Sequence, residues 1–338
     1  MTQLSDLIWL YIYSVLTPTM ASSDRMLFRS SAVSLLPRIQ NGLSQTELVH
    51  VPHPFWPLRT STPRLQHARP LRISVLDASF NPPTLAHLAL VNAARPSYPR
   101  DLNAEGRLDD DDNRDYDAHL LLLSVRNADK SLKPTDATYI QRLEMMHLLA
   151  QQVQPSSRTT EPNVAVGIIN EPTFIGKSTR LLDFLSTHVQ TLSQAYPESI
   201  PLSESERIRF ELSFILGLDT LERLVSPRYY PSEAAMLTSL RRFFSPSEEN
   251  SLVVCARRKS SGGDALGGKD KLALAREFID ARRVCMIDIG EDESTYSSTT
   301  VRTAIGGKGL GEEGQKAWRR YVPSTVADYI VEQKLYVA

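Results

Sequence analysis

A histidine lies at the start of a predicted helix, at a position where phosphate groups commonly bind. An apolar strand at Arg72–Leu76 is followed by a turn that contains Pro83, and proline suits the first turn of a helix because its missing N–H costs nothing there. Thr84 and His87 then fall near the free backbone N–H groups and the positive end of the helix dipole. A cationic histidine is disfavoured there unless an anion compensates it, which indicates a phosphate partner. Taken alone, a packing histidine beside a proline-rich turn is the commoner explanation.

A second segment of this kind occurs late in the chain, where serines and threonines precede an arginine. The segment Ser294–Ile305, STYSSTTVRTAI, follows another apolar strand at Val284–Ile289. Ser and Thr side chains are good N-caps, so a helix is predicted to begin here with Arg302 in or near its first turn. An arginine there opposes the helix dipole, unless Arg302 and the free N–H groups bind the same phosphate chain. On its own, the segment could also be a polar loop with an unrelated arginine.

Short apolar strands alternate with helical patterns from residue 72 onward. The strand candidates are nearly continuous in apolar character, as expected for strands covered on both faces. They are Arg72–Leu76, Leu120–Val125, Val164–Ile169, Leu212–Leu216, Leu252–Ala256 and Val284–Ile289. The helical candidates are Pro83–Ala94, Thr138–Gln152, Thr179–Val189, Ala234–Phe244 and Lys271–Arg282. This alternation predicts an α/β fold with a doubly wound parallel sheet.

The two polar segments together resemble the signatures of the nicotinamide mononucleotide adenylyltransferases, a family of the nucleotidyltransferase superfamily. SFNPPTLAHL, Ser79–Leu88, resembles the SFNPxTxxH form of the GxFxPxHxGH signature, and is closer still to the D-x-SFNPPHLAH segment of fungal relatives. YSSTTVR, Tyr296–Arg302, resembles the family's ISSTxxR signature. Both matches follow strands and occur in the family's order, so the pair is more specific than either half. The resemblance implies a Rossmann-like doubly wound parallel sheet of the nucleotidyltransferase type.

The resemblance assigns ATP-binding roles to residues of three segments. His87 matches the histidine that contacts and stabilises the ATP phosphates during transfer, and Thr84 matches a position that is Thr or His in the family. The segment with Arg302 grips the β- and γ-phosphates. ILGLDTLERL resembles the GxDxLxxF segment of the adenosine pocket, although Asp219 could instead be a helix N-cap. The implied ATP-binding set is Ser79, Phe80, Thr84, His87, Gly217, Asp219, Ser297, Ser298, Thr299 and Arg302, with His87 and Arg302 catalytic.

The segments that would bind the mononucleotide, to which the family transfers the adenylyl group, resemble the family less completely. The segment Asn127–Ala150 resembles the family's lysine-bearing loop and RxxM helix, which makes Lys130 or Lys133 a phosphate contact and Arg142 a structural or site residue. The family stacks nicotinamide on a tryptophan within a WE pair, where this chain has NEPTFIGKS. Phe174 could supply the flat apolar face that a pyridine ring needs, or it could belong to the core.

The implied reaction is adenylyl transfer from ATP to nicotinamide mononucleotide, which gives NAD and pyrophosphate. Mg²⁺ is expected to be bound to the substrate phosphates, without a dedicated protein site. Ala78, in place of the family's glycine, and the missing tryptophan leave an alternative open. In that alternative, the chain is an ATP-binding or ATP-hydrolysing regulatory or interaction protein on the same fold, with little or no transferase activity and with residues 1–70 as its docking surface. Nicotinamide and nicotinate mononucleotide both stay open as acceptors.

Two glycine–lysine segments approach the GxxxxGK[ST] phosphate loop without completing it. GDALGGKD has Asp270 where a Mg²⁺-binding hydroxyl is required. The segment that ends in Gly176, Lys177 and Ser178 has Glu171 in place of the leading glycine. A phosphate-loop kinase or ATPase is therefore disfavoured.

The overall composition disfavours several other classes of protein. The 38 Lys and Arg residues balance 39 Asp and Glu residues, so no global positive field attracts nucleic acid or an acidic membrane. Cys255 and Cys285 lie far apart in unlike contexts, which excludes a disulfide framework and a CxxC metal pair and favours a reducing compartment. We expect a protein of the cytoplasm or nucleus, and leave homo-oligomers open.

Residues 1–70 are predicted to be an extension and a linker, outside a nucleotidyltransferase domain at residues 71–338. The apolar run Leu7–Leu16 is about half of the ~20 residues that span a bilayer, and no basic residue precedes it as in a secretory signal. Arginines after Met20 leave mitochondrial targeting open, but a docking helix is favoured. Prolines at 52, 54, 57, 63 and 70 predict an irregular linker, so residues 71–338 are expected to fold alone.

Overall fold

The computed structural model describes eight stretches of the chain. They are residues 23–59, 69–96, 115–126, 135–155, 160–200, 208–257, 275–307 and 317–337. Lys130 and Lys133 lie outside the described residues, as does the segment GDALGGKD.

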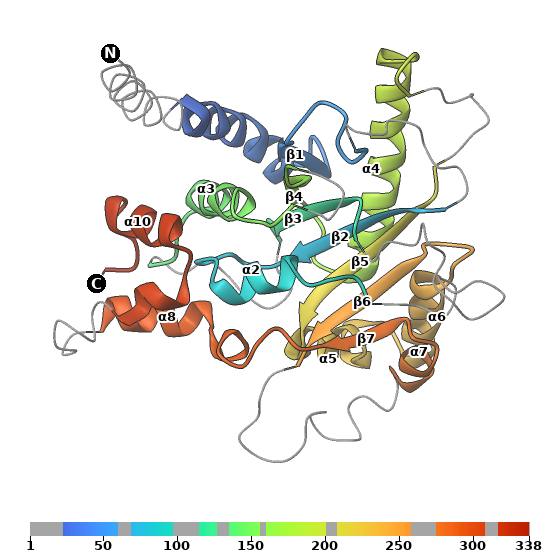
Figure 1. Cartoon of the computed structure of the whole chain (residues 1–338). Helices are drawn as coiled ribbons and strands as arrows, with labels where there is room; N and C mark the ends of the chain where they lie inside the picture. The colour runs from blue at the N-terminus through green and yellow to red at the C-terminus, as the bar shows by residue number, and fades with distance from the viewer. Residues whose placement is uncertain are drawn as a thin grey trace, which may run out of the picture.

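Seven strands form one mixed sheet in the order β1-β4-β3-β2-β5-β6-β7 (Figure 1). The strands are β1 (Thr46–His50), β2 (Leu71–Asp77), β3 (Ala118–Ser124), β4 (Val164–Ile169), β5 (Phe210–Gly217), β6 (Ser251–Ala256) and β7 (Val284–Ile287). Neighbours from β4 to β7 are parallel, and β1 is antiparallel to β4. Counted from β2, the parallel strands follow the order 3-2-1-4-5-6 of the Rossmann fold. The predicted fold class is thereby confirmed.

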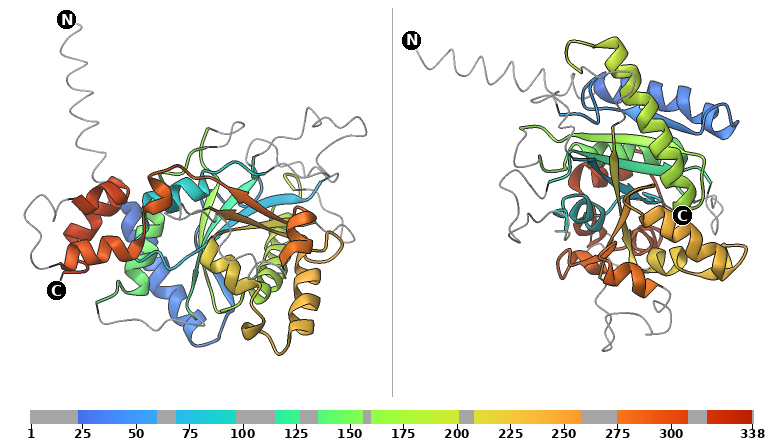
Figure 2. Two further views of the ribbon diagram at one scale, coloured as in Figure 1. Left: turned by 90° about the horizontal axis from the view of Figure 1, so that it is seen from below. Right: turned by 90° about the vertical axis from the view of Figure 1, so that its right-hand side faces the viewer.

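Helices cover both faces of the sheet (Figures 1 and 2). A helix over residues 23–40, α2 (Leu85–Val91) and α3 (Tyr139–Ala150) contribute to one face. The other face carries α4 (Phe174–Ala195), α5 (Leu218–Leu224), α6 (Glu233–Phe244) and α7 (Arg276–Asp280). A third cluster joins α8 (Ser298–Gly306) and α10 (Ser324–Glu332) to α3. Short 3-10 turns lie at Pro227–Tyr229, Glu293–Thr295 and Trp318–Tyr321.

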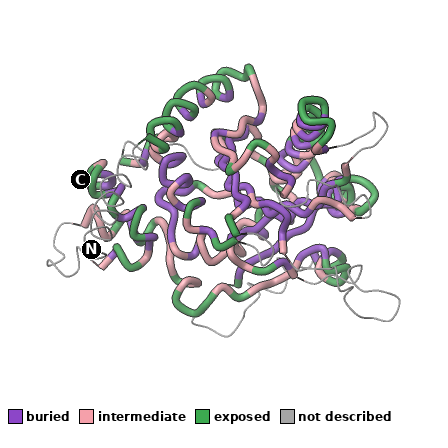
Figure 3. Tube along the Cα trace, turned by 45° about the horizontal axis from the view of Figure 1, so that its top comes forward, coloured by how far each residue is buried: buried purple, intermediate pink, exposed green. Residues whose placement is uncertain are grey.

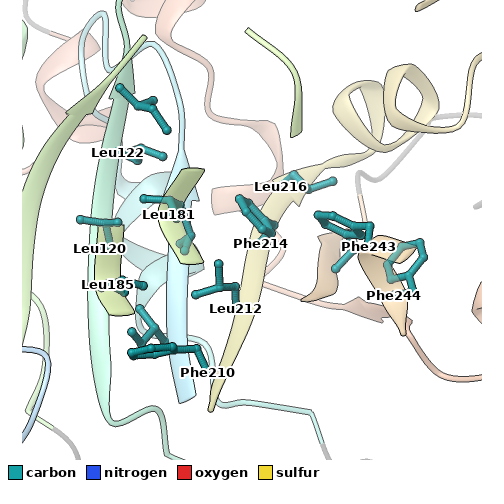
Figure 4. Close-up of a cluster of buried hydrophobic side chains, with 14 of the residues drawn as sticks. Leu120, Leu122, Leu181, Leu185, Phe210, Leu212, Phe214, Leu216, Phe243 and Phe244 are labelled. Atoms are coloured by element: carbon teal, nitrogen blue, oxygen red, sulfur yellow. The ribbon is translucent and has the colours of Figure 1, made fainter. Parts of the chain in front are cut away.

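The main core lies between the sheet and α4 and α6. Figure 4 shows Phe214 of β5 between Leu181 of α4 and Phe243 of α6. Each large apolar side chain buried in this way contributes about 1.5–3 kcal/mol. Burial is nearly continuous along the central strands of the sheet, whereas α4 and α6 are buried along one stripe (Figure 3). Among the described residues, no helix combines the length and apolar character needed to cross a bilayer.

Much of the predicted extension packs into this fold. Phe28, Ala32, Leu36 and Ile39 recur at helical spacing and are buried on the face of α3. The strand β1 extends the sheet beyond β4, and Trp56 is fully buried in the main core. Residues 51–58 are irregular, as the prolines predict, and they also pack into the main core through Trp56 and Leu58, because proline prevents regular hydrogen bonding rather than packing.

Candidate active site

The two segments that carry the family resemblance, Ser79–Leu88 and Tyr296–Arg302, meet at the carboxyl end of the sheet. The strand β2 ends at Asp77 and its neighbour β5 ends at Gly217, while the helices that follow them cover opposite faces. The order of the parallel strands reverses at this pair. Open α/β sheets bind ligands in the crevice outside such a reversal. The turn over residues 78–84 leads directly from β2 into α2 at this position.

His87 is a neutral hydrogen-bond donor in the first turn of α2. The backbone N–H of Thr84 donates to His87 Nδ1 at 3.0 Å, and the Thr84 hydroxyl lies 2.8 Å from the same atom. Nδ1 is thus an acceptor, which places the ring proton on Nε2. Burial lowers the pKa of His87 to about 4. A neutral ring agrees with the expectation that a cation is disfavoured at this helix start when no anion is bound, and its Nε2–H donor also suits an anion.

The start of α8 contacts the turn after β2. Ser298 Oγ donates to the Pro82 carbonyl at 2.7 Å, and Arg302 donates to the Asn81 carbonyl. Ser297 caps α8 by accepting the Thr300 N–H at 3.1 Å, as the Ser/Thr pattern predicts. The structure therefore brings together two segments that lie far apart in the sequence.

Arg302 keeps an exposed side while it binds this turn. Its guanidinium also lies 3.3 Å from Thr299 Oγ1 and 3.8 Å from the Asp136 carboxylate. The side chain is 28% exposed, so solvent reaches it. Arg302, which directly follows the first turn of α8, thus lies against the turn that leads into α2 and His87.

Asp136 connects both segments, although sequence analysis did not identify it. Its carboxylate accepts the Asn81 side-chain amide at 2.8 Å and lies 3.6 Å from Arg142. Arg142 also donates to the Ala137 carbonyl at 2.8 Å. Burial lowers the pKa of Arg142. Arg142 thus holds Asp136 and the Ala137 carbonyl in place. This corresponds to the structural role, one of the two roles predicted for it. Asp136 precedes the helix cap Thr138, so its sequence context indicates capping rather than a site.

An ion pair and an aromatic ring lie beside this turn, at the start of α4. Thr173 caps α4 by accepting the Gly176 N–H, so α4 begins at Phe174 rather than at the predicted Thr179. Lys177 pairs with Asp77 at the end of β2, and the two side chains are 4% and 9% exposed. The Lys177 ammonium also lies 4.8 Å from the Phe174 ring centroid. Sequence analysis missed the role of Lys177 because Gly176–Ser178 was weighed only as part of a phosphate loop.

Phe174 has an intermediate position between core and site. Its ring meets Phe214 edge-on at a centroid distance of 5.8 Å, and the side chain is half-buried. Packing explains why residue 176, two positions later, is a glycine: an added Cβ would overlap the Glu171 carboxyl group. Phe174 is therefore close to the crevice without being fully enclosed by the core.

The predicted adenosine segment lies across the strand reversal. Gly217 is the N-cap of α5, and an added Cβ there would meet no atom of the described chain within 4 Å. Asp219 is exposed in the first turn of α5. The alternative prediction that Asp219 is the N-cap is wrong, because Gly217 occupies that position. Among the described residues, no group of three or more His, Cys, Asp or Glu side chains is placed to hold a metal ion.

Comparison with known proteins gives one significant curated relative. No family model matches the chain. Over 190 residues, the chain is 28% identical to a Schizosaccharomyces pombe (strain 972 / ATCC 24843) protein named "Putative nicotinamide mononucleotide adenylyltransferase". This name agrees with the family that the motifs resemble. The match covers 56% of this chain and 55% of the relative, so the chain spans about half the length of the relative it matches.

Solved structures of Plasmodium falciparum nicotinic acid mononucleotide adenylyltransferase are also similar. The complexes with APC and with NaAD are 13% and 14% identical to this chain, with TM-scores of 0.39 and 0.40. Each alignment covers 78% of this chain, and 96% and 97% of the respective solved chains. The fold assignment rests on the strand order rather than on these alignments.

Proposed function

We propose that this chain is a nucleotidyltransferase that transfers the adenylyl group of ATP to nicotinamide mononucleotide, with NAD and pyrophosphate as products. The observation that carries the proposal is the contact of Ser298 and Arg302 with the turn that leads to His87. This contact joins two anion-directed helix starts at the strand reversal, where Rossmann-like sheets bind nucleotides. The name of the curated relative supports the same reaction.

The proposed chemistry requires no side-chain nucleophile. An oxygen of the acceptor 5′-phosphate attacks the α-phosphorus of ATP, a new P–O bond forms, and the bond to the β-phosphate oxygen breaks to release pyrophosphate. The protein's task is to hold two anions together and to stabilise the charge that develops. His87 Nε2–H, Arg302 and the N–H groups at the start of α8 supply hydrogen bonds and positive charge for this purpose.

The donors of the site fit phosphates that carry their own Mg²⁺. The Asp136 carboxylate already accepts the Asn81 amide and faces two arginines, so the groups left around the turn are mainly N–H and O–H donors. We propose that phosphate oxygens and water, rather than a cluster of carboxylates, supply most Mg²⁺ ligands. The ion would neutralise phosphate charge when bound.

The acceptor side is proposed to lie at the start of α4. Phe174 offers an aromatic surface there, beside the buried Asp77–Lys177 pair. Because the ammonium occupies one region over the ring, the pyridine would stack on the remaining surface or against the ring edge. Lys130 and Lys133, from the loop before α3, remain proposed contacts of the acceptor phosphate.

The test is a direct product assay with the full-length chain. The protein is incubated with ATP, Mg²⁺ and nicotinamide mononucleotide, and in parallel with nicotinate mononucleotide, and products are separated by chromatography. We expect equal amounts of dinucleotide and pyrophosphate, with no pyrophosphate when the acceptor is left out. Formation of ADP and phosphate alone would favour the regulatory ATP-binding alternative, and absence of any product would contradict both activities.

One observation weakens the regulatory alternative. That alternative used residues 1–70 as a docking surface for a partner. In the structure, residues 46–58 instead supply a strand and core side chains to the domain, and the helix over residues 23–40 buries its apolar stripe against it. The described part of this segment therefore has an intramolecular role that requires no partner.

A further inference from the structure

The C-terminal segment reaches the side chain of Asn81, in the middle of the turn that precedes α2. Tyr336 donates its hydroxyl hydrogen bond to Asn81 Oδ1 at 2.8 Å, across 255 residues of sequence. Tyr336 is 7% exposed and Asn81 is 4% exposed, so water does not readily replace this contact. A hydrogen bond between two buried polar groups is costly to leave unmade.

Every polar atom of the Asn81 side chain is engaged by this arrangement. Oδ1 also accepts the Ala137 N–H at 3.2 Å, and Nδ2 donates to the Asp136 carboxylate at 2.8 Å. The amide is therefore held from the start of α3 and from the C-terminal segment at once. Three partners fix both its position and its orientation.

The backbone that directly follows this side chain carries the contacts to α8. The Asn81 carbonyl accepts from Arg302 and the Pro82 carbonyl accepts from Ser298. A rotation or shift of Asn81 would move both carbonyls, and with them the two phosphate-directed side chains. Tyr336 thus acts on the same turn as Arg302 from another direction.

The segment that carries Tyr336 is anchored firmly enough to fix this turn. Val326, Ala327 and Ile330 of α10 are buried, and Tyr329 donates to the buried carboxylate of Glu144 at 2.7 Å. An added Cβ on Gly306, at the end of α8, would lie 3.4 Å from the Tyr336 carbonyl. The C-terminal segment therefore packs against α8 as well as against the turn.

We propose that Tyr336 is a positioning residue for ATP, which acts through Asn81 to hold the turn before α2 against Ser298 and Arg302. The proposal rests on the proposed function for the identity of the nucleotide. Nothing in it depends on the acceptor. In this proposal, the C-terminal segment is part of the nucleotide site, because it holds the turn in place.

The experiment compares Tyr336→Phe with Tyr196→Phe in the full-length chain. Tyr336→Phe removes one hydroxyl and keeps the ring. Tyr196 is 42% exposed at the end of α4, and its hydroxyl has no hydrogen-bond partner among the described residues, so Tyr196→Phe is the matched control. The readouts are the ATP Kd by calorimetry, kcat and both KM values, the melting temperature, and amide hydrogen exchange of residues 79–87 without ligand.

Tyr336→Phe is expected to weaken ATP binding about three- to tenfold, as for one lost hydrogen bond, and to speed exchange of residues 79–87. The acceptor KM should change less than the ATP KM, and Tyr196→Phe should match the wild type. Combined with Ser298→Ala, the loss should be less than additive, because both act on the same turn. A wild-type ATP Kd and wild-type exchange in Tyr336→Phe would overturn the proposal, as would a variant that is simply unfolded. Failure of the wild type to form dinucleotide would instead overturn the proposed function, while the exchange result still decides the role of Tyr336.

Discussion

The two sides of the candidate site are built in different ways. On the proposed ATP side, the turn before α2 is held by groups from α8, the start of α3 and the C-terminal segment. On the acceptor side, the Asp77–Lys177 pair and Phe174 join one strand end to the first turn of α4, and the charges are buried against each other. The first arrangement presents hydrogen-bond donors to an anion, whereas the second presents an aromatic surface with little net charge.

This difference explains why one side has a recognisable sequence pattern and the other does not. Phosphate binding at a helix start depends on a short run of residues with fixed spacing, which a sequence displays directly. Recognition of a flat ring depends on which side chains the fold places around it, and many sequences satisfy that requirement.

The largest effect is expected on folding, from a deletion that would disrupt the proposed ATP side and the proposed acceptor side together. Removal of residues 1–58 would uncover β4, on which β1 pairs, and would empty the core space of Trp56. We expect the shortened chain to lose cooperative unfolding, in contrast to the sequence-based expectation that residues 71–338 fold alone. Circular dichroism during heating measures this, and a sharp transition near the wild-type temperature would restore that expectation.

A large effect confined to the ATP side is expected from His87→Ala. This change removes one preorganised donor, which is worth roughly a hundredfold or more in turnover. The fold should persist, because the one buried donor that loses its acceptor, the Thr84 N–H, costs only about 1–3 kcal/mol. Steady-state kinetics and circular dichroism on one preparation measure both properties. Normal turnover in folded protein would remove His87 from the mechanism.

A smaller effect is expected from Phe174→Ala, which should change acceptor binding rather than ATP binding. Loss of an aromatic contact should raise the acceptor KM roughly two- to tenfold and leave the ATP KM nearly unchanged. Arg302→Ala serves as the contrast, since it should weaken ATP binding and turnover together. If Phe174 is mainly a core residue, Phe174→Ala will instead lower stability by a few kcal/mol, and both substrates will suffer only through lost folded protein. Melting temperature and both KM values separate these results.

The smallest effect on kcat/KM is expected from a change of pH between 6 and 8. Burial lowers the pKa of His87 to about 4, so His87 stays neutral throughout this range and its titration should not appear in kcat/KM. Burial lowers the pKa values of His50 and His119 to about 4 as well. Because the unfolded chain binds protons near pH 6.5 and the folded chain does not, the free energy of unfolding should fall as pH decreases from 6.5 towards 4. An inflection near pH 6.5 that disappears in His87→Ala would contradict the assigned neutral state.

The sequence was most informative where structure depends on local pattern. The strand at Val164–Ile169 is observed with the predicted ends, and the Ser/Thr run before Arg302 caps a helix as expected. The strand β1 was missed, since TELVH is short and only partly apolar and lies next to a proline-rich stretch. Its place in the sheet depends on pairing with β4, which lies far along the chain.

The supporting residues of the site were the hardest to predict. Asp136 and Tyr336 contact Asn81 from 55 and 255 residues away, and neither belongs to a pattern that signals the contact. The role of Lys177 depends on α4 beginning at Phe174, which in turn depends on the Thr173 cap. Such contacts follow from the packed fold, so a single sequence shows the residues without showing that they meet.

The central claim is that the joined helix starts serve transfer of the adenylyl group rather than hydrolysis of ATP. The most direct measurement follows labelled phosphorus from ATP, in separate reactions labelled at the α- and γ-positions, with nicotinamide mononucleotide and Mg²⁺ present. We predict that the α-label appears in the dinucleotide and the γ-label in pyrophosphate, at equal rates. An α-label that remains in ADP, with the γ-label released as free phosphate, would contradict the account.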